Sequence, residues 1–145
     1  MAVEIRLSYE GGLRCAAVHG PSGARLHTDA PVDNHGRGEA FSPTDLVTAA
    51  LGACMLTIMG IVAERHGIDV RGVTVRLEKH MLADPDRRIG RLPAVITVPG
   101  RVSEEHKKLL ERAALTCPVH KSLDPRIERP VQFVWAGETA AAAHA

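Results

Sequence analysis

The chain has 145 residues, the usual size of one domain, and its 45% hydrophobic and 24% charged residues exclude a disordered or fibrous protein. Eighteen basic residues oppose seventeen acidic ones, so the net charge of +1 provides no field that would attract nucleic acid or an anionic membrane. Aromatic residues make up only 3%, too few for a base-stacking surface. We therefore expect a globular protein that binds neither nucleic acid nor membranes.

The first third of the chain has the pattern of a β-hairpin followed by a long loop. Apolar and polar residues alternate over residues 3–9, an apolar run covers residues 13–19, and Gly11 and Gly12 lie between them. Residues 28–39 are rich in Pro, Gly, Asp and Asn, and this composition predicts a surface loop. Loops of this length often carry function.

A long helix is predicted from Pro43 to His66. Ser42 can cap its first turn, Pro43 suits the first helical position, and Gly67 can end the helix. The 18 positions from 46 to 63 hold no charged residue, as in a membrane span, but the interspersed Gly, Thr and Ala residues favour a soluble helix buried on all sides. A helix that is apolar all round needs protein on every face, which predicts a homodimer whose partner subunit covers the remaining face.

The second half of the chain predicts the further strands and helices of an α+β fold. Strands are expected within residues 68–82 and 88–102, as a second hairpin, and within residues 127–135. Helices are expected from residue 103 onward and over residues 118–123. We assign a single domain to residues 1–135 and expect the small residues of 136–145 to fray.

The three cysteines are expected to be free thiols. The first fifteen residues lack the apolar run of a secretory signal, which predicts a cytoplasmic protein and a reducing environment for Cys15, Cys54 and Cys117. No spacing of cysteines and histidines matches a zinc site. Accordingly, no metal and no other cofactor are expected.

Cys117 stands in a special electrostatic position. Pro118 suits the first position of a short helix, which makes Cys117 its N-cap, where helix N–H groups favour a thiolate and should bring the pKa below about 8.5. His120 lies on the same helical face, and Lys121 adds a positive charge. The alternative is a buried, inert cysteine beside an ordinary surface histidine.

Cys54 lies deep in the apolar helix, where burial should raise the pKa of its thiol and make it inert. It becomes a useful nucleophile only if a cation or hydrogen-bond donor from elsewhere in the fold reaches it. Arg14, Arg25 and Arg37 precede the helix and are candidates for that role. The alternative is an ordinary core cysteine, and Cys15 is expected to pack within a strand.

The two cysteine contexts together are more specific than either alone. The helix around Cys54 reads FSPTDLVTAALGACMLTIM, and 63 residues later Cys117 stands in TCPVHKSL. Together with GGLR, SGARLHTDAPVDNHG and LEKHM in the same order, these segments resemble the OsmC-like family, which includes osmotically inducible protein C and the organic hydroperoxide resistance proteins. The resemblance covers nearly the whole chain and is closest to the less characterised branch with SPTDL and CPVHKSL. It implies an α+β fold with antiparallel sheets around a long central helix, and an intertwined homodimer with active sites at the subunit interface.

The resemblance further implies a thiol-dependent peroxidase that reduces organic hydroperoxides or hydrogen peroxide. Cys54 is then the peroxidatic residue, which becomes a sulfenic acid, and Cys117 resolves it as a disulfide. A lipoyl-type dithiol is the implied reductant.

This chain departs from the family at the residues that activate the peroxidatic thiol. The family's glutamate falls at Thr44 and its arginine near Leu13. The candidates to replace them are Arg14, Arg25, His120 and Lys121. The departure leaves open whether the chain is an enzyme, and the rival hypothesis is a non-catalytic dimer that binds a small hydrophobic or reactive molecule in an interfacial cleft.

Overall fold

The computed structural model describes residues 1–138 of the chain. Helices and strands are both present, which confirms the expected α+β class. The chain forms two compact units, Met1–Val47 and Thr48–Ala145, and each contains a sheet of its own. The single domain expected over residues 1–135 stays a prediction.

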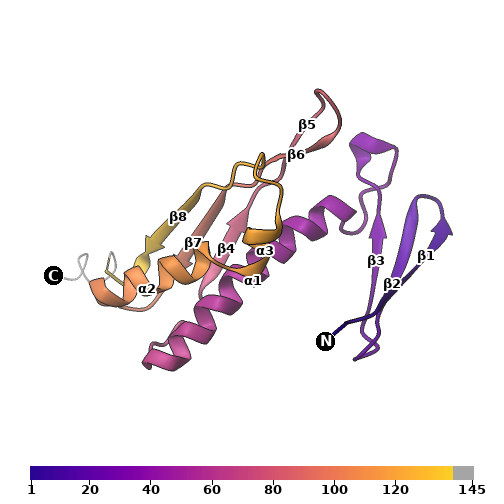
Figure 1. The fold of residues 1–145 in the computed structure, drawn as a ribbon. Coiled ribbons are helices and arrows are strands. Elements are labelled where there is room, and N and C mark those ends of the chain that lie inside the picture. Colours follow the sequence, from indigo (N-terminus) through magenta and orange to yellow (C-terminus); the bar gives the residue numbers. More distant parts are fainter. Residues whose placement is uncertain (139–145) are drawn as a thin grey trace. The chain divides into compact units, whose positions relative to one another are not determined.

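The first unit contains a three-stranded antiparallel sheet in the order β1–β2–β3 (Figure 1). Strands β1 (Ile5–Gly11) and β2 (Arg14–His19) form the predicted hairpin, and Gly12 in the turn has a φ of 62°, which glycine adopts without strain. Strand β3 (Arg25–Asp29) was not expected from the sequence, and it forms because its backbone pairs with β2 along its length. The predicted surface loop therefore begins only after Asp29.

Helix α1 (Pro43–His66) begins and ends where the sequence predicts. The backbone N–H of Asp45 donates to Ser42 Oγ at 3.1 Å, and the Asp45 carboxylate accepts from the backbone N–H of Ser42 at 3.0 Å. This reciprocal arrangement satisfies donors that a helix start leaves without partners. Gly67 follows the last helical residue with a φ of 65°, a conformation typical of helix ends.

The second unit contains a sheet in the order β4–β7–β8 and a separate two-stranded hairpin of β5 and β6. The strands are β4 (Thr74–Leu77), β5 (His80–Leu82), β6 (Arg88–Arg91), β7 (Ala94–Val98) and β8 (Val131–Trp135). The predicted second hairpin is thus divided between two sheets. Strand β8 runs parallel to β7, whereas antiparallel sheets were expected. The parallel pairing follows from the helical crossover that connects these two strands.

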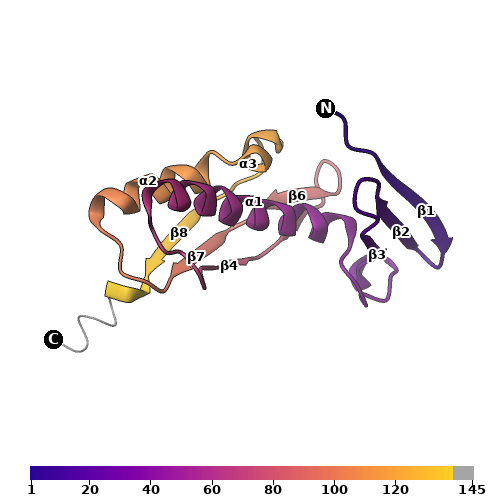
Figure 2. The ribbon, with the colours of Figure 1, turned by 90° about the horizontal axis from the view of Figure 1, so that it is seen from below.

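That crossover consists of α2 (Glu104–Leu115) and α3 (Pro118–Ser122). Figure 2 shows α1 and α2 on the same side of the β4–β7–β8 sheet. Side chains from the two helices and from the sheet region are buried in this unit, and those with almost no exposed surface include Leu51, Met55, Met59, Leu92, Ile96, Val98 and Leu110. The core of this unit therefore holds α1 against the sheet.

Within one chain, α1 is buried on one side only. Leu51, Met55 and Met59 follow a helical spacing on the buried side, whereas Ala49, Ala53 and other small residues are exposed. By length and composition alone, α1 meets the criteria for a membrane-spanning helix. The core helix of a soluble protein meets the same criteria. The sequence predicts that this helix is buried on all sides. A single chain covers only one side, so the prediction requires a second protein surface against the other.

The C-terminal residues 139–145 lie outside the described part of the chain, and so does most of the segment expected to fray. Just before them, Glu138 forms an ion pair with Lys107 of α2. The Lys107 ammonium group also lies 5.5 Å from the ring centre of Trp135 in β8, within the range of a cation–π contact.

Candidate functional site

Helix α3 holds Cys117 in the geometry of an N-cap, as predicted. Its Sγ accepts a hydrogen bond from the backbone N–H of His120 at 3.3 Å, and Pro118 occupies the first turn of the helix. Cys117 has no exposed surface. The sequence places it here because proline lacks the N–H that a helix start cannot use, while a side chain at the cap can accept from the N–H groups that follow.

The structure brings Cys54 and Cys117 together, although 63 residues separate them in the chain. Cys54 lies in α1, half-buried, and its thiol is close enough to the Cys117 thiol to raise the pKa of that group. The two helices that carry them lie side by side in Figure 1. Both cysteines are free thiols, as is Cys15, and they form a reduced dithiol within the second unit.

The predicted pKa of Cys117 is wrong in direction. Burial raises the pKa of this thiol, and the neighbouring Cys54 thiol raises it further. The backbone N–H groups of His120 and Val119 lower it, each by less than burial raises it, and the net shift is upward. The sequence argument considered only the helix end, whereas the loss of water around the sulfur comes from the tertiary fold and dominates. Cys117 is accordingly a neutral thiol at pH 7.

Two basic side chains of the second unit have buried nitrogen atoms without a hydrogen-bond partner in the described part of the chain. These atoms are Nδ1 of His120 and Nη1 of Arg129. Burial lowers the pKa of His120, and the nearby positive charge of Arg129 lowers it further, so the imidazole is neutral at pH 7. Sequence reasoning identified His120 but missed Arg129, because the segment before β8 has no motif that would single it out.

The remaining residues that the sequence suggested for the site lie in different parts of the chain. Lys121 is exposed on α3. Arg14 and Arg25 belong to the first unit, where Arg14 lies 3.9 Å from the carboxylate of Glu39. Their role toward the thiols stays a prediction. Cys15, also in the first unit, is half-buried in β2 opposite Tyr9.

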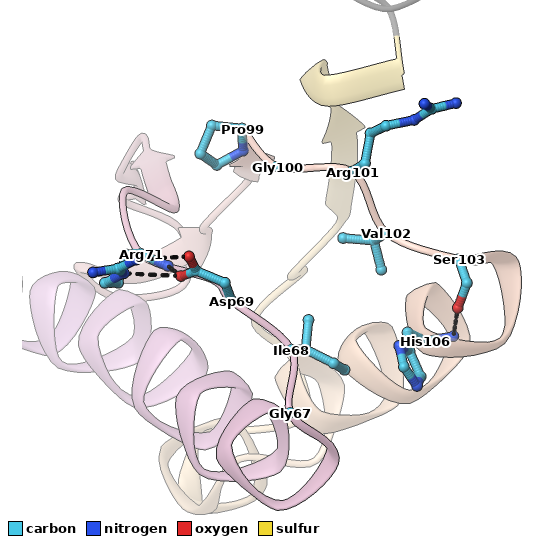
Figure 3. Close-up of a pocket in the computed structure, with 10 residues that line it drawn as sticks. All are labelled: Gly67, Ile68, Asp69, Arg71, Pro99, Gly100, Arg101, Val102, Ser103 and His106. Carbon is cyan, nitrogen blue, oxygen red and sulfur yellow. Dashed lines mark hydrogen bonds and ion pairs between the residues drawn. The ribbon is translucent and has the colours of Figure 1, made fainter.

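A cavity of about 570 Å³ lies at the other end of α1 and is drawn in Figure 3. It begins at Gly67, 13 residues and therefore about 20 Å along the helix from Cys54. Arg71 donates to Asp69 at 2.9 Å and lowers the pKa of that carboxyl to about 2. No cysteine lines this cavity, and among residues 1–138 no three side chains of His, Cys, Asp or Glu are grouped as metal ligands.

The arrangement defines a class: an α+β protein in which a long apolar helix presents one thiol to a second thiol at the start of a short helix. A model of the OsmC-like protein family matches residues 36–129, and the chain belongs to this family. No curated protein sequence matches the chain. Proteins of the family are soluble, commonly cytoplasmic and commonly homodimers.

Solved structures with the same fold support the family assignment. A Psychrobacter arcticus protein, described as an osmotic stress induced and detoxification response protein, has 45% identity and a TM-score of 0.85, covering 89% of this chain and 93% of that one. An organic hydroperoxide resistance protein OsmC from Legionella pneumophila has 18% identity and a TM-score of 0.76, covering 93% and 98%. Another such protein from Elizabethkingia anophelis has 18% identity and a TM-score of 0.73, covering 92% and 96%. The two structures with 18% identity show that the fold is shared.

Proposed function

We propose that the protein is a thiol-dependent peroxidase for organic hydroperoxides or hydrogen peroxide, with Cys54 as the peroxidatic thiol and Cys117 as the resolving thiol. The observation that carries the proposal is the proximity of these two thiols, which are close enough for Cys54 to act on the pKa of Cys117. A peroxidase that closes an intramolecular disulfide needs two sulfur atoms within reach of each other. The proposed reaction uses only these two cysteines and gives Cys15 no role.

The reaction proceeds in three balanced steps. The Cys54 thiolate attacks one peroxide oxygen, the O–O bond breaks, and the products are a Cys54 sulfenic acid and an alkoxide that leaves as the alcohol after taking up a proton. The Cys117 thiol then attacks the sulfenic sulfur, which forms the disulfide and releases water. An external dithiol reduces the disulfide by thiol–disulfide exchange, becomes oxidised itself and returns both cysteines to thiols.

The electrostatics around Cys117 support its role as the resolving thiol. Burial raises the pKa of Cys117, so this thiol keeps its proton at pH 7 until the sulfenic acid has formed. It must then lose the proton, because the thiolate is the attacking species. The pKa of His120 is lowered, so its imidazole is neutral and can accept that proton. Lys121, Arg14 and Arg25 are the further candidates for stabilising a Cys54 thiolate.

We also propose that the active species is a homodimer. In the first unit, Ile5, Leu7 and Tyr9 alternate along β1 and are 58%, 64% and 66% exposed. In the second unit, α1 leaves one side uncovered, with Ile61 41% exposed. Apolar surfaces of this kind are usually covered by a partner, and a second copy of the chain would cover both.

A non-catalytic dimer that binds a small hydrophobic or reactive molecule is the second candidate function. It is favoured by Thr44, which stands where the resemblance places an activating glutamate. In that case the two thiols would contribute packing or sense oxidants, and peroxide would not be turned over.

The experiment compares peroxide consumption by wild type, Cys54→Ser, Cys117→Ser and, as a matched control, Cys15→Ser. With cumene hydroperoxide and a dithiol we expect turnover by wild type and Cys15→Ser and none by Cys54→Ser. Mass spectrometry after one equivalent of peroxide should find a Cys54–Cys117 disulfide in wild type and a dimedone-reactive sulfenic acid in Cys117→Ser. Equal consumption by wild type and Cys54→Ser would contradict the proposal, and thiols that stay reduced would favour the binding protein.

A further inference from the structure

A second cavity of the second unit lies between the β5–β6 hairpin and the segment that leads into β8. It has a volume of about 400 Å³, a size typical of small-molecule sites. No cysteine of the described chain lines it, so it is separate from the dithiol. We call it the arginine groove, because its lining includes Arg88, Arg91 and Arg126 together with Leu82, Gly90 and Glu128.

Backbone hydrogen bonds fix the two walls of the arginine groove against each other. The pairing of β5 with β6 shifts register between His80 and Met81, which leaves Gly90 of β6 as a bulge without a partner in β5. The carbonyl of Gly90 instead accepts from the backbone N–H of Glu128 at 3.0 Å. The backbone N–H of Leu92 donates to the carbonyl of Glu128 at 2.8 Å. The groove is therefore preformed and does not depend on a ligand for its shape.

Leu82 gives the arginine groove an apolar surface. Its side chain is 45% exposed and packs directly against Gly90, where a Cβ atom would lie only 2.4 Å from Leu82 Cγ. The bare backbone of Gly90 thus makes room for Leu82 in the lining. A ligand with an apolar body can bury this surface.

The charges of the arginine groove are unequal. Arg126 is paired with Asp124, and Arg91 lies 3.5 Å from Glu128. Arg88 makes no ion pair within the described residues, although its charge, after the much closer Arg126, helps to lower the pKa of Asp124 to about 2.

Three guanidinium groups therefore share two carboxylates at close range. Asp86 acts on Arg126 only through its charge, from outside ion-pair distance. The groove keeps one positive charge without a carboxylate in contact, which is the charge that a bound monoanion would balance.

Donor groups remain available in the arginine groove after the internal pairs are made. Arg126 donates to Asp124 through Nε at 3.1 Å and Nη2 at 2.8 Å, which leaves Nη1. Arg91 approaches Glu128 through Nε, which leaves both terminal nitrogens. The two side chains are 61% and 47% exposed, so a ligand in the groove can reach these N–H groups.

These features select the chemistry of the ligand. The planar fork of a guanidinium group matches the two oxygens of a carboxylate. A single negative charge balances the groove, whereas a phosphate dianion would leave excess negative charge beside Glu128. The exposed Leu82 side chain favours a ligand that carries an apolar body next to its charge.

We propose that the arginine groove binds a small monocarboxylate with an apolar body. Arg91 and Arg126 hold the carboxylate, and Leu82 contacts the body. This site is additional to the dithiol, and the proposal does not depend on the proposed peroxidase function.

The test measures binding to the full chain by calorimetry at low salt. The probes are 2-naphthoate, its neutral analogue 2-naphthamide, acetate, which lacks the apolar body, and inorganic phosphate. The variants are Arg126→Gln, Arg91→Gln and Leu82→Ala. Arg101→Gln is a control of equal charge change, because Arg101 lines the other cavity, drawn in Figure 3.

We expect 2-naphthoate to bind with at least about tenfold higher affinity than 2-naphthamide or acetate, since only this probe uses both the arginines and Leu82. Each of the three groove variants should lower its affinity by about threefold to tenfold, the range of a partly exposed charged contact or of a lost apolar one. Arg101→Gln should leave the affinity unchanged. Rising salt should weaken binding, because the contact is electrostatic and partly exposed.

Several outcomes would overturn the proposal. These are equal affinity for 2-naphthoate and 2-naphthamide, no saturable binding of 2-naphthoate at millimolar concentrations, and unchanged affinity in both arginine variants of the groove. A loss of binding in Arg101→Gln alone would place the ligand in the other cavity. Tighter binding of inorganic phosphate than of 2-naphthoate would refute the monocarboxylate. Circular dichroism of each variant confirms that the comparison concerns folded protein.

Discussion

The contact between α1 and β4 depends on the absence of a side chain at Gly52. A Cβ atom at this position would lie 2.6 Å from Leu77 Cδ1 and 3.2 Å from Val75 Cγ1, inside normal van der Waals separation. Gly52→Val introduces three carbon atoms into this contact. Overpacking of a core costs about 1–3 kcal/mol, and the better helix propensity of valine returns roughly 0.4 kcal/mol. The free energy of unfolding should therefore fall by about 0.6–2.6 kcal/mol.

Gly60→Ala on the same helix is the matched control. A Cβ at Gly60 meets no atom within 4 Å, so alanine adds helix propensity without a clash and should stabilise the protein by about 0.5–1 kcal/mol. The assay is urea unfolding followed by far-ultraviolet circular dichroism, at one fixed protomer concentration because the protein is proposed to dimerise. If Gly52→Val unfolds at the same urea concentration as wild type while Gly60→Ala is stabilised, the packing argument for α1 against β4 is refuted.

Three further predictions concern single side chains. Because the pKa of His120 is lowered by burial and by Arg129, the folded protein should lose stability as the pH falls below about 6.5, and urea unfolding should show a weaker pH dependence for His120→Gln. The raised pKa of Cys117 has the opposite effect on the pH dependence of stability. Stability should fall as the pH rises past 9.0, because the thiol ionises at a lower pH in the unfolded chain than in the folded protein. Cys117→Ser should remove this loss of stability between about pH 8 and 10. Ser42→Ala removes the cap that accepts from the Asp45 N–H and should lower the free energy of unfolding by about 0.5–2 kcal/mol, with an unchanged value counting against the capping box.

Local capping could be predicted from the sequence because it involves residues only a few positions apart. Ser42 and Asp45 satisfy each other's backbone groups at the start of α1, and Cys117 accepts from His120 across one turn of α3. The pairing of β3 with β2 and the parallel pairing of β8 with β7 could not be predicted in this way. Strand pairing depends on contacts between distant segments, whose partners no local pattern specifies.

The same distinction applies to the candidate site. The N-cap position of Cys117 was predicted correctly, yet the direction of its pKa shift was not, because burial depends on what the rest of the fold places around the sulfur. Arg129 illustrates the same limit. It is one of eighteen basic residues and has no distinguishing neighbours in the sequence, and only the fold brings its charge to His120.

The two thiols differ in how tightly the fold holds them. Cys54 lies in the middle of a 24-residue helix that is locked against the core by Leu51 and Met55, whereas Cys117 stands at the start of a five-residue helix. A disulfide requires Cβ atoms about 3.5–4.5 Å apart and a defined dihedral angle, so bond formation restricts both residues to one geometry. Displacing Cys54 would disturb the core, whereas reorienting the Cys117 side chain gives up its 3.3 Å hydrogen bond from His120. Closure of the disulfide is therefore best accommodated at Cys117, and it alters the immediate surroundings of His120.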